Sequence, residues 1–242
     1  MKTKLVILLL FIVQGVHGQT AKMRTVSELI NKQDPGWELV LEWMKQATNK
    51  VEVLPKDNKR AEQALYETQV TTRSPMGAIV YETGGILIDE GWIRILGSGS
   101  THLNRSLIGW NMGKSMSQLG ERPSFLLIAD DAIGGFFAIN GGAFGAEDAG
   151  KIFYFSPDNL EWESLGIGYS EFLTFCFSGD LTKFYEGLRW NGWQAEIKNM
   201  DGNQGISFYP FLWTKEGKDL SIVSRRPVPI EELWTLYNEQ KK

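Results

Sequence analysis

The sequence is poor in the residues that build disulfides and metal centres. Its 242 residues include one cysteine, Cys176, and two histidines, of which only His102 lies beyond the N-terminal leader described below. A single cysteine excludes an intramolecular disulfide, and so few His and Cys ligands almost exclude a zinc site. Phenylalanines stand at positions 172, 175 and 177, which predicts a buried and unreactive thiol at Cys176.

Common catalytic and cofactor-binding motifs are also missing. The chain has no S-x-x-K motif, and the segment 96–101 (LGSGST) does not match the G-x-S-x-G pattern. Residues 109–115 (GWNMGKS) have three residues between the glycines where a phosphate loop has four, and no buried strand precedes them. We therefore predict no cofactor and no metal, an exposed loop histidine at His102 and an exposed Trp110.

The N-terminus has the pattern of a secretory signal. Lys2 and Lys4 precede an uncharged apolar run over residues 5–13, and Val16-His17-Gly18 offers a cleavage site before Gln19. This predicts a signal peptide over 1–18 and a periplasmic or secreted protein over 19–242. The run is short for a bilayer span, so no stable membrane insertion is expected after cleavage. Met23 is an alternative start, which would leave the protein in the cytoplasm.

The charge of the mature chain is mildly acidic. Loss of Lys2 and Lys4 leaves 23 basic and 29 acidic residues, a net charge of −6. This balance argues against a nucleic-acid partner. The hydrophobic content of 43% and the absence of repeats or low-complexity tracts are typical of a globular domain. The sequence leaves the oligomeric state open.

The pattern of elements predicts an α+β fold. Thr25 to Glu28 form a capping box, Asp34 and Pro35 open a second helix, and a third is expected over 58–69. Strands are then expected at 78–81, 86–88, 92–96, 125–129, 136–140, 152–155 and 160–164. Helices at 170–177 and 180–188, a strand at 206–213 and a helix after Pro229 follow. We predict a single domain with a central, mostly antiparallel sheet flanked by N-terminal and C-terminal helices.

The candidate binding surface lies on loops at strand ends, including a long polar excursion over 97–123. Six residues are predicted to form this surface. Arg73 and Arg94 offer fixed positive charge, Trp110 offers an aromatic ring, and hydrogen-bonding groups come from Asn111, Asp130 and Asp131. The alternative is structural: the two arginines would pair with acids such as Glu82 or Asp89, and Asp131 would cap a turn.

Two pairs of acids raise the possibility of glycoside hydrolysis. Asp130 and Asp131 follow an apolar strand, while Glu161 and Glu163 flank Trp162 and share one face of a strand. A simpler interpretation is favoured, in which the aspartates end a strand and the glutamates face water opposite a buried Trp162. No catalytic residue is predicted.

Several phrases resemble a bacterial family of unknown function, domain-of-unknown-function family 2625. The similarity spans about residues 23–226 and is carried by 69–77 (QVTTRSPMG), 91–97 (GWIRILG), 127–131 (LIADD), 153–158 (FYFSPD) and 184–190 (FYEGLRW). That family has no assigned activity. A more distant pattern, a Gly-Gly-aromatic strand pair over 134–140 with a strand at 150–155 and a helix at 170–177, is similar to the SUKH (Smi/Knr-like) superfamily. This resemblance implies an α+β fold and, for some members, immunity proteins that bind toxins.

Three functional hypotheses follow. The first is an exported, non-enzymatic binding protein with a protein partner, in the manner of an immunity protein. The second is a carboxylate-dependent hydrolase that acts on glycans through Asp130, Asp131 or Glu161. The third is a structural domain of a larger assembly. An enzyme is less expected than a binding protein.

Overall fold

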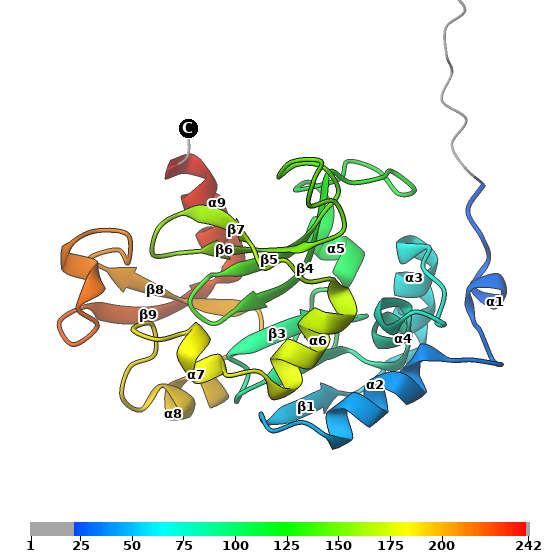
Figure 1. The fold of residues 1–242 in the computed structure, drawn as a ribbon, viewed down its shortest axis with the longest axis horizontal. Coiled ribbons are helices and arrows are strands. Elements are labelled where there is room, and N and C mark those ends of the chain that lie inside the picture. The colour runs from blue at the N-terminus through cyan, green and yellow to red at the C-terminus, as the bar shows by residue number, and fades with distance from the viewer. Residues whose placement is uncertain (1–21, 241–242) are drawn as a thin grey trace, which may run out of the picture.

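The computed structural model describes residues 22–240, and its N-terminal third alternates short helices with one strand (Figure 1). The elements are α1 (Val26–Leu29), α2 (Gly36–Lys45), β1 (Val51–Leu54), α3 (Asn58–Thr68) and α4 (Pro75–Glu82). The Thr25 backbone N–H donates to Glu28 Oε2 at 2.7 Å, as the predicted capping box requires. Helix α2 begins one residue later than predicted, with Pro35 in the N-cap position. The predicted signal peptide lies outside the described residues.

Within the described residues, β1 belongs to a seven-stranded sheet whose strand order follows the chain, and every neighbouring pair is antiparallel. The other strands are β2 (Gly85–Ile88), β3 (Ile93–Leu96), β4 (Phe125–Asp131), β5 (Phe136–Asn140), β6 (Ile152–Ser156) and β7 (Glu161–Ser164). A tight turn joins β2 to β3, with φ values of 48° at Asp89, 59° at Glu90 and 90° at Gly91. This order leaves β1 and β7 at the edges.

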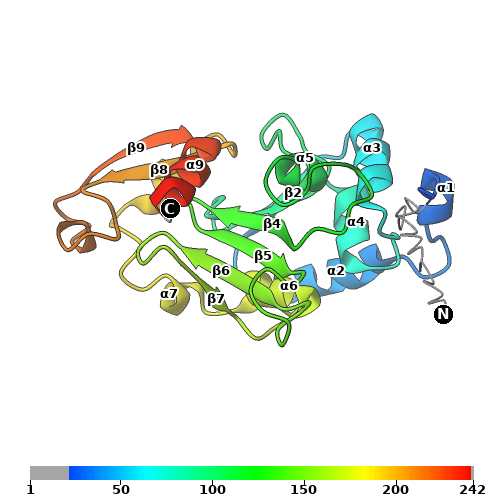
Figure 2. The same cartoon turned by 90° about the horizontal axis from the view of Figure 1, so that it is seen from above.

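The remaining elements cover the sheet and extend it at one end (Figure 2). They are α5 (Leu107–Asn111), α6 (Tyr169–Ser178), α7 (Leu181–Phe184), α8 (Trp193–Lys198), β8 (Gln204–Tyr209), a 3₁₀ turn (Glu216–Lys218), β9 (Ser224–Pro229) and α9 (Ile230–Gln240). Strands β8 and β9 form a separate antiparallel pair. The fold is therefore the α+β single domain that the sequence predicts.

Neighbouring aromatic residues of β5 show which helix covers which face of the sheet. The ring centroid of Phe137 lies 5.0 Å from that of Phe172 in α6, whereas that of Phe136 lies 5.1 Å from that of Trp234 in α9. Successive side chains of a strand point to opposite faces, so α6 and α9 pack on opposite sides. Cys176 of α6 is fully buried, which confirms its predicted burial.

The strand expected over 78–81 is wrong, because these residues form helix α4. Ser74 caps the helix by accepting a hydrogen bond from the Gly77 N–H at 3.1 Å, and Pro75 occupies the first helical position. Ala78, Ile79 and Val80 are all fully buried. A short helix that is apolar on every side gives the same run of letters as a buried strand.

The segment 97–123 is not a surface excursion throughout. Helix α5 packs on β4 because the Asn111 side chain donates to Leu127 O and accepts from Leu127 N, each at 2.8 Å. Leu107 and Trp110 are buried as a result, so the expected exposure of Trp110 is wrong, while His102 is exposed as predicted. The predicted helix over 180–188 is shorter, and the predicted strand over 206–213 ends at Tyr209.

Strands β1 and β9 and helix α8 were not anticipated. Among residues 22–240, none of the helices has the length and apolar character needed to span a bilayer.

Candidate functional site

The structure places the six predicted site residues in two environments. Five of them are buried, namely Arg94, Trp110, Asn111, Asp130 and Asp131. Arg73 is exposed, and its Nε lies 3.2 Å from Asp34 Oδ2. The expectation that all six lie on accessible loops is therefore wrong for the buried five, since β3, β4 and α5 carry them into the core. Glu82 and Asp89 are not the partners of Arg73 and Arg94; they pair with Lys56 and Arg189.

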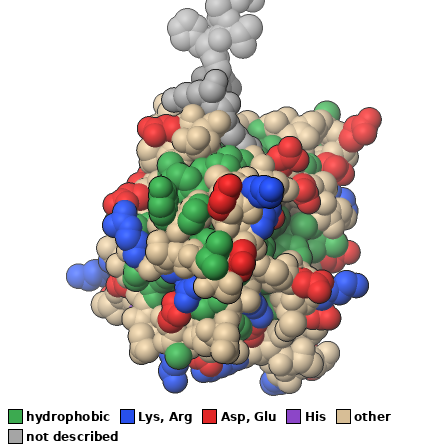
Figure 3. Space-filling view, turned by 90° about the vertical axis from the view of Figure 1, so that its left-hand side faces the viewer, with side chains coloured by type: hydrophobic (Ala, Val, Ile, Leu, Met, Phe, Trp, Pro, Cys, Tyr) green, Lys and Arg blue, Asp and Glu red, His purple; other side chains and the backbone are tan. Residues whose placement is uncertain are grey.

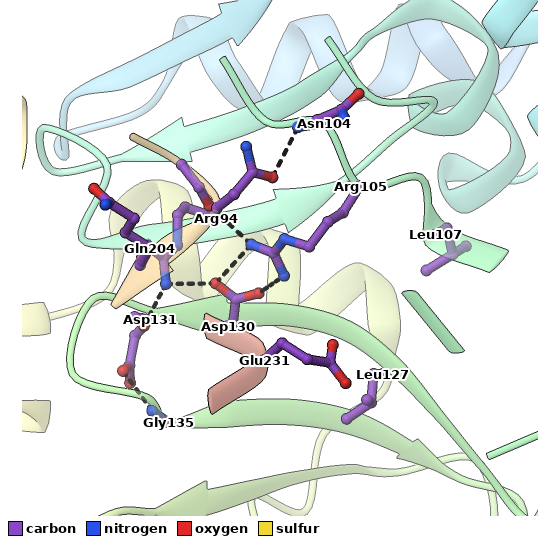
Figure 4. A network of polar contacts seen from close by, with 12 residues as sticks. Arg94, Asn104, Arg105, Leu107, Leu127, Asp130, Asp131, Gly135, Gln204 and Glu231 are labelled. Carbon is purple, nitrogen blue, oxygen red and sulfur yellow. Dashed lines mark hydrogen bonds and ion pairs between the residues drawn. The ribbon is translucent and has the colours of Figure 1, made fainter. Parts of the chain in front are cut away.

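Two of the buried residues, Arg94 and Asp130, meet Arg105 in a network of charges (Figure 4). The pairing of β3 with β4 sets Arg94 opposite Asp130, and Arg94 Nη2 lies 2.6 Å from Asp130 Oδ1. Arg105 contacts the other carboxylate oxygen of Asp130 and donates to Gly202 O at 2.9 Å. A buried carboxylate held by two guanidinium groups is compensated in charge and hydrogen bonding, as burial requires.

Asp131 caps the turn between β4 and β5, which is the structural alternative raised by the sequence. Its Oδ1 accepts from the Ile133 N–H at 3.1 Å and the Gly135 N–H at 2.7 Å. Its Oδ2 accepts from the Tyr154 hydroxyl at 2.7 Å and the Tyr185 hydroxyl at 3.1 Å. Burial raises the pKa of Asp131, against the hydrogen bonds from Tyr154 and Gly135, which lower it. Asp130 and Asp131 are both fully buried, so neither carboxylate is exposed to solvent.

Two cations contact the ring of Trp110. The Arg105 Cζ lies 4.5 Å and the Lys114 Nζ 4.0 Å from its ring centroid. Arg105 thereby joins Trp110 to Asp130 and Arg94, so the structure brings together most of the predicted residues. Their contacts are with the backbone and with neighbouring side chains, among them the Tyr154 and Tyr185 hydroxyls. We call Arg94, Arg105, Asp130 and Asp131 the buried frame.

An open cleft of about 430 Å³ lies beside β6 and β7. One wall comes from β6, β7 and the turn between them, and the other from segments 184–188 and 212–220. Figure 3 views the end of the molecule that carries β8 and β9 and shows hydrophobic and charged side chains interspersed there. The polar lining residues are Tyr154, Ser156, Asp158, Asn159, Glu163, Glu186 and Lys218, and the apolar ones include Phe184, Leu188, Leu212 and Leu220.

The floor of the cleft connects to the buried frame. Tyr154 lines the cleft and also donates its hydroxyl proton to Asp131. Burial raises the pKa of Tyr154 well above its ordinary value, helped by the neighbouring Asp131 charge, so the hydroxyl remains a donor. The ring is therefore held in one orientation and presents its side to the cleft.

Asp158 is the most constrained acid in the cleft. It accepts from the Ser156 hydroxyl, and its Oδ2 lies 2.9 Å from Lys218 Nζ. Partial burial raises the pKa of Asp158, but the Ser156 hydrogen bond and the Lys218 ammonium outweigh this and hold the pKa below its ordinary value. Asp158 and Lys218 thus neutralise each other and tie the two walls together.

Glu163 and Glu186 give the cleft its remaining charge. Both are exposed, and Glu163 accepts a hydrogen bond from Asn159 at 3.0 Å. Among the described residues, neither glutamate forms an ion pair. Because Lys218 is paired with Asp158, the charges of Glu163 and Glu186 are not compensated by a basic side chain of the cleft. They lie beside the aromatic and aliphatic side chains that line it.

Comparison with known proteins places the chain in a family. Residues 26–233 match the family model described as "Protein of unknown function DUF2625". The chain belongs to the DUF2625 family. It is 44% identical over 225 residues to "Putative uncharacterized protein YbfG" of Escherichia coli (strain K12), covering 91% of this chain and 98% of the relative. It is 48% identical over 190 residues to an uncharacterized protein of Haemophilus influenzae, covering 78% and 83% respectively.

These matches confirm the resemblance to DUF2625 and do not show the more distant similarity to SUKH proteins. Sequence reasoning missed Asp158, Glu186 and Lys218 as site residues of this DUF2625 chain. The family phrases over 153–158 and 184–190 contain Asp158 and Glu186, so they already marked both walls of the cleft. Lys218 carried no comparable signal.

Across residues 22–240 of this DUF2625 protein, no group of three or more His, Cys, Asp or Glu side chains is arranged to hold a metal ion.

Proposed function

We propose that this protein is a non-enzymatic binding protein whose cleft receives a positively charged side chain, lysine or arginine, from a partner protein. One observation carries the proposal: Glu163 and Glu186 face an open cleft without a basic partner among the described residues. A guanidinium or ammonium group between them would form charge-assisted hydrogen bonds. The methylene stem of such a side chain would lie against Phe184 and Leu188.

Binding is favoured over glycan hydrolysis by the state of the acids. A glycosidase needs a reachable carboxyl group with a raised pKa to protonate the leaving group. Burial raises the pKa of Asp131, but that side chain is fully buried and bonded to four donors. Asp158, the partly buried acid of the cleft, has the opposite shift.

Export completes the proposal. The lysines and apolar run before Gln19 favour cleavage and release into the periplasm or the medium, where the partner would be met. An immunity-like role, in which binding blocks a partner's active site, is one form that this function would take.

The test uses the smallest ligand that carries the proposed group. Nα-acetyl-arginine amide is titrated into isotopically labelled protein, and the backbone amide shifts of Asp158, Glu163 and Glu186 are followed by NMR. Nα-acetyl-citrulline amide, which has the same shape without the charge, is the control ligand. We expect saturable shifts at the cleft with arginine and none with citrulline.

A matched pair of variants locates the effect. Glu163→Gln/Glu186→Gln is expected to abolish the shifts, whereas Glu62→Gln/Glu232→Gln removes the same charge from exposed positions on α3 and α9 and is expected to preserve them. Equal shifts with citrulline, or unchanged shifts in the cleft variant, would contradict the proposal.

A further inference from the structure

We propose that the partner binds as an extended segment along the free edge of β7 and adds an eighth strand to the sheet. This rests on the proposed function, because the added strand would deliver its basic side chain to the cleft. Strand β7 lies at one edge of the seven-stranded sheet and pairs with β6 on its other side (Figure 2). Three of its four residues are exposed.

The backbone of β7 has donors and acceptors that point away from β6. Leu165, directly after the strand, donates its N–H to Ile152 O at 2.8 Å and so faces β6. Backbone groups alternate in direction along an antiparallel strand, so Glu163 and Glu161 also face β6, while Ser164 and Trp162 face outward. Within residues 22–240, no hydrogen bond satisfies these outward backbone groups. Such an edge is the template for strand addition.

Side chains of β7 specify the chemistry of the added strand. Glu161 and Glu163 share the sheet face of Ser156 and Tyr154, their partners in β6, and this face borders the cleft. A residue directly opposite in an added strand stands about 4.5–5.5 Å away, between Cβ atoms. Lysine or arginine at alternate positions would therefore pair with both glutamates.

The other face of β7 carries Trp162 and the exposed Ser164. Trp162 packs there with its ring centroid 5.5 Å from that of Phe155 and 6.3 Å from that of Phe125. The intervening residues of the added strand would meet this surface, so an apolar side chain fits them. The partner segment is thus an alternating basic and apolar strand.

The same charges disfavour a second copy of this chain as the occupant. Two β7 edges pairing with each other would bring glutamates of one chain next to glutamates of the other, and like charges opposite each other destabilise a sheet. Edge charges of this kind are a known protection against self-association.

The experiment uses the peptide acetyl-Val-Lys-Val-Lys-Val-amide, labelled with a fluorophore and followed by anisotropy. Ser164→Pro removes an outward N–H and places the proline ring where the added strand would lie, while the bonds to β6 remain. Ser164→Ala is the matched control. We expect at least about a tenfold weaker peptide affinity in Ser164→Pro, the loss that corresponds to one or two main-chain hydrogen bonds, and no change in Ser164→Ala.

A second measurement does not depend on the variant folding. The same peptide with N-methyl groups on alternate residues keeps its side chains but loses one row of backbone donors. One peptide is methylated on its valines and the other on its lysines. Only one of these two sets of N–H groups faces β7 in an added strand, so methylation of that set is expected to abolish binding and methylation of the other set to leave it unchanged.

Three outcomes would overturn the strand-addition proposal. They are equal affinity of Ser164→Pro and Ser164→Ala, equal binding of both methylated peptides and the parent, or self-association of the protein that Ser164→Pro removes. In each case the arginine-amide titration reports separately on the cleft: if its shifts persist, the proposed function stands without strand addition, and if they are absent, the cleft proposal itself fails.

Discussion

At the scale of single residues, Asp131 has the densest set of contacts in the frame beneath the cleft. Both of its carboxylate oxygens are occupied, by two backbone N–H groups and by the hydroxyls of Tyr154 and Tyr185. Gly135 approaches so closely that a Cβ there would collide with Asp131 Oδ2 and with the Tyr154 ring. The position of Tyr154 in the cleft therefore depends on the fully buried side chain of Asp131.

Replacing Asp131 by alanine is expected to lower the free energy of unfolding by about 1–3 kcal/mol for each buried donor left without a partner. Urea unfolding followed by circular dichroism measures this change. Glu147→Ala, at an exposed loop position, serves as the control and should stay within about 0.5 kcal/mol of the parent. A parent-like stability of Asp131→Ala would mean that the frame is not needed for folding.

Asp158 makes stability depend on pH. Its pKa is depressed in the folded state, so its carboxylate stabilises the fold above the unfolded value near 4, and this contribution is lost as the pH falls through the folded pKa. Asp158→Asn should therefore be less stable than the parent at pH 7, and the difference should shrink toward pH 3. Unfolding midpoints across this range test the trend, and a difference that grows on acidification would contradict it.

At the scale of elements, the strands from β2 to β7 were readable from the sequence because Gly and Asp turns separate short apolar runs. Helix α4 was not, since the burial of Ala78 to Val80 on every side removes the helical period. The burial of Arg94 and Asp130 escaped sequence reasoning for a different reason. It depends on Arg105, from the irregular segment that joins β3 to β4, and on Gln204 O, which is 110 residues from Arg94 in the chain.

The cap of α4 offers a test at this scale. Ser74→Ala removes the acceptor for the Gly77 N–H and is expected to lower the free energy of unfolding by about 1 kcal/mol. The exposed Ser170 of α6 donates and accepts no side-chain hydrogen bond among the described residues, so Ser170→Ala is a suitable comparison. Equal effects of the two substitutions would remove the cap as the explanation for where α4 begins.

The packing of α6 predicts the behaviour of Cys176. Burial raises the pKa of this thiol well above its ordinary value, which leaves little thiolate at neutral pH. We expect no reaction with Ellman's reagent in the native protein and one equivalent of thiol in denaturant. Rapid labelling of the native protein would show that α6 separates readily from the sheet.

At the scale of the whole molecule, the cleft could not be located from the sequence, because its two walls are distant in the chain. The ion pair between Asp158 and Lys218 spans 60 residues, and it joins the segment between β8 and β9 to the turn between β6 and β7. The sequence predicted neither β9 nor the fold of that loop. The alternation of polar residues along the strand drew attention to Glu161 and Glu163. It did not indicate that Glu186 and Lys218 line the same cleft as Glu163.

The predicted signal peptide over residues 1–18 leads to a prediction about the mature N-terminus of the protein. If residues 1–18 are removed on export, the intact mass of protein recovered from the envelope of its own host should correspond to a chain that begins at Gln19. A cytoplasmic protein that begins at Met1 or Met23 would contradict this prediction, and the partner would then have to be sought inside the cell.

The buried frame has a consequence for how the chain reaches its native state. Arg94 contacts Asp130, Asp131 O and Gln204 O, and Asp131 in turn holds Tyr154 and Tyr185. No shorter piece of the chain satisfies all of these charges, so a half-formed sheet would bury unpaired ions. Folding is therefore expected to be all-or-none from β3 to β8, and a chain cut before β8 should fail to yield a stable sheet.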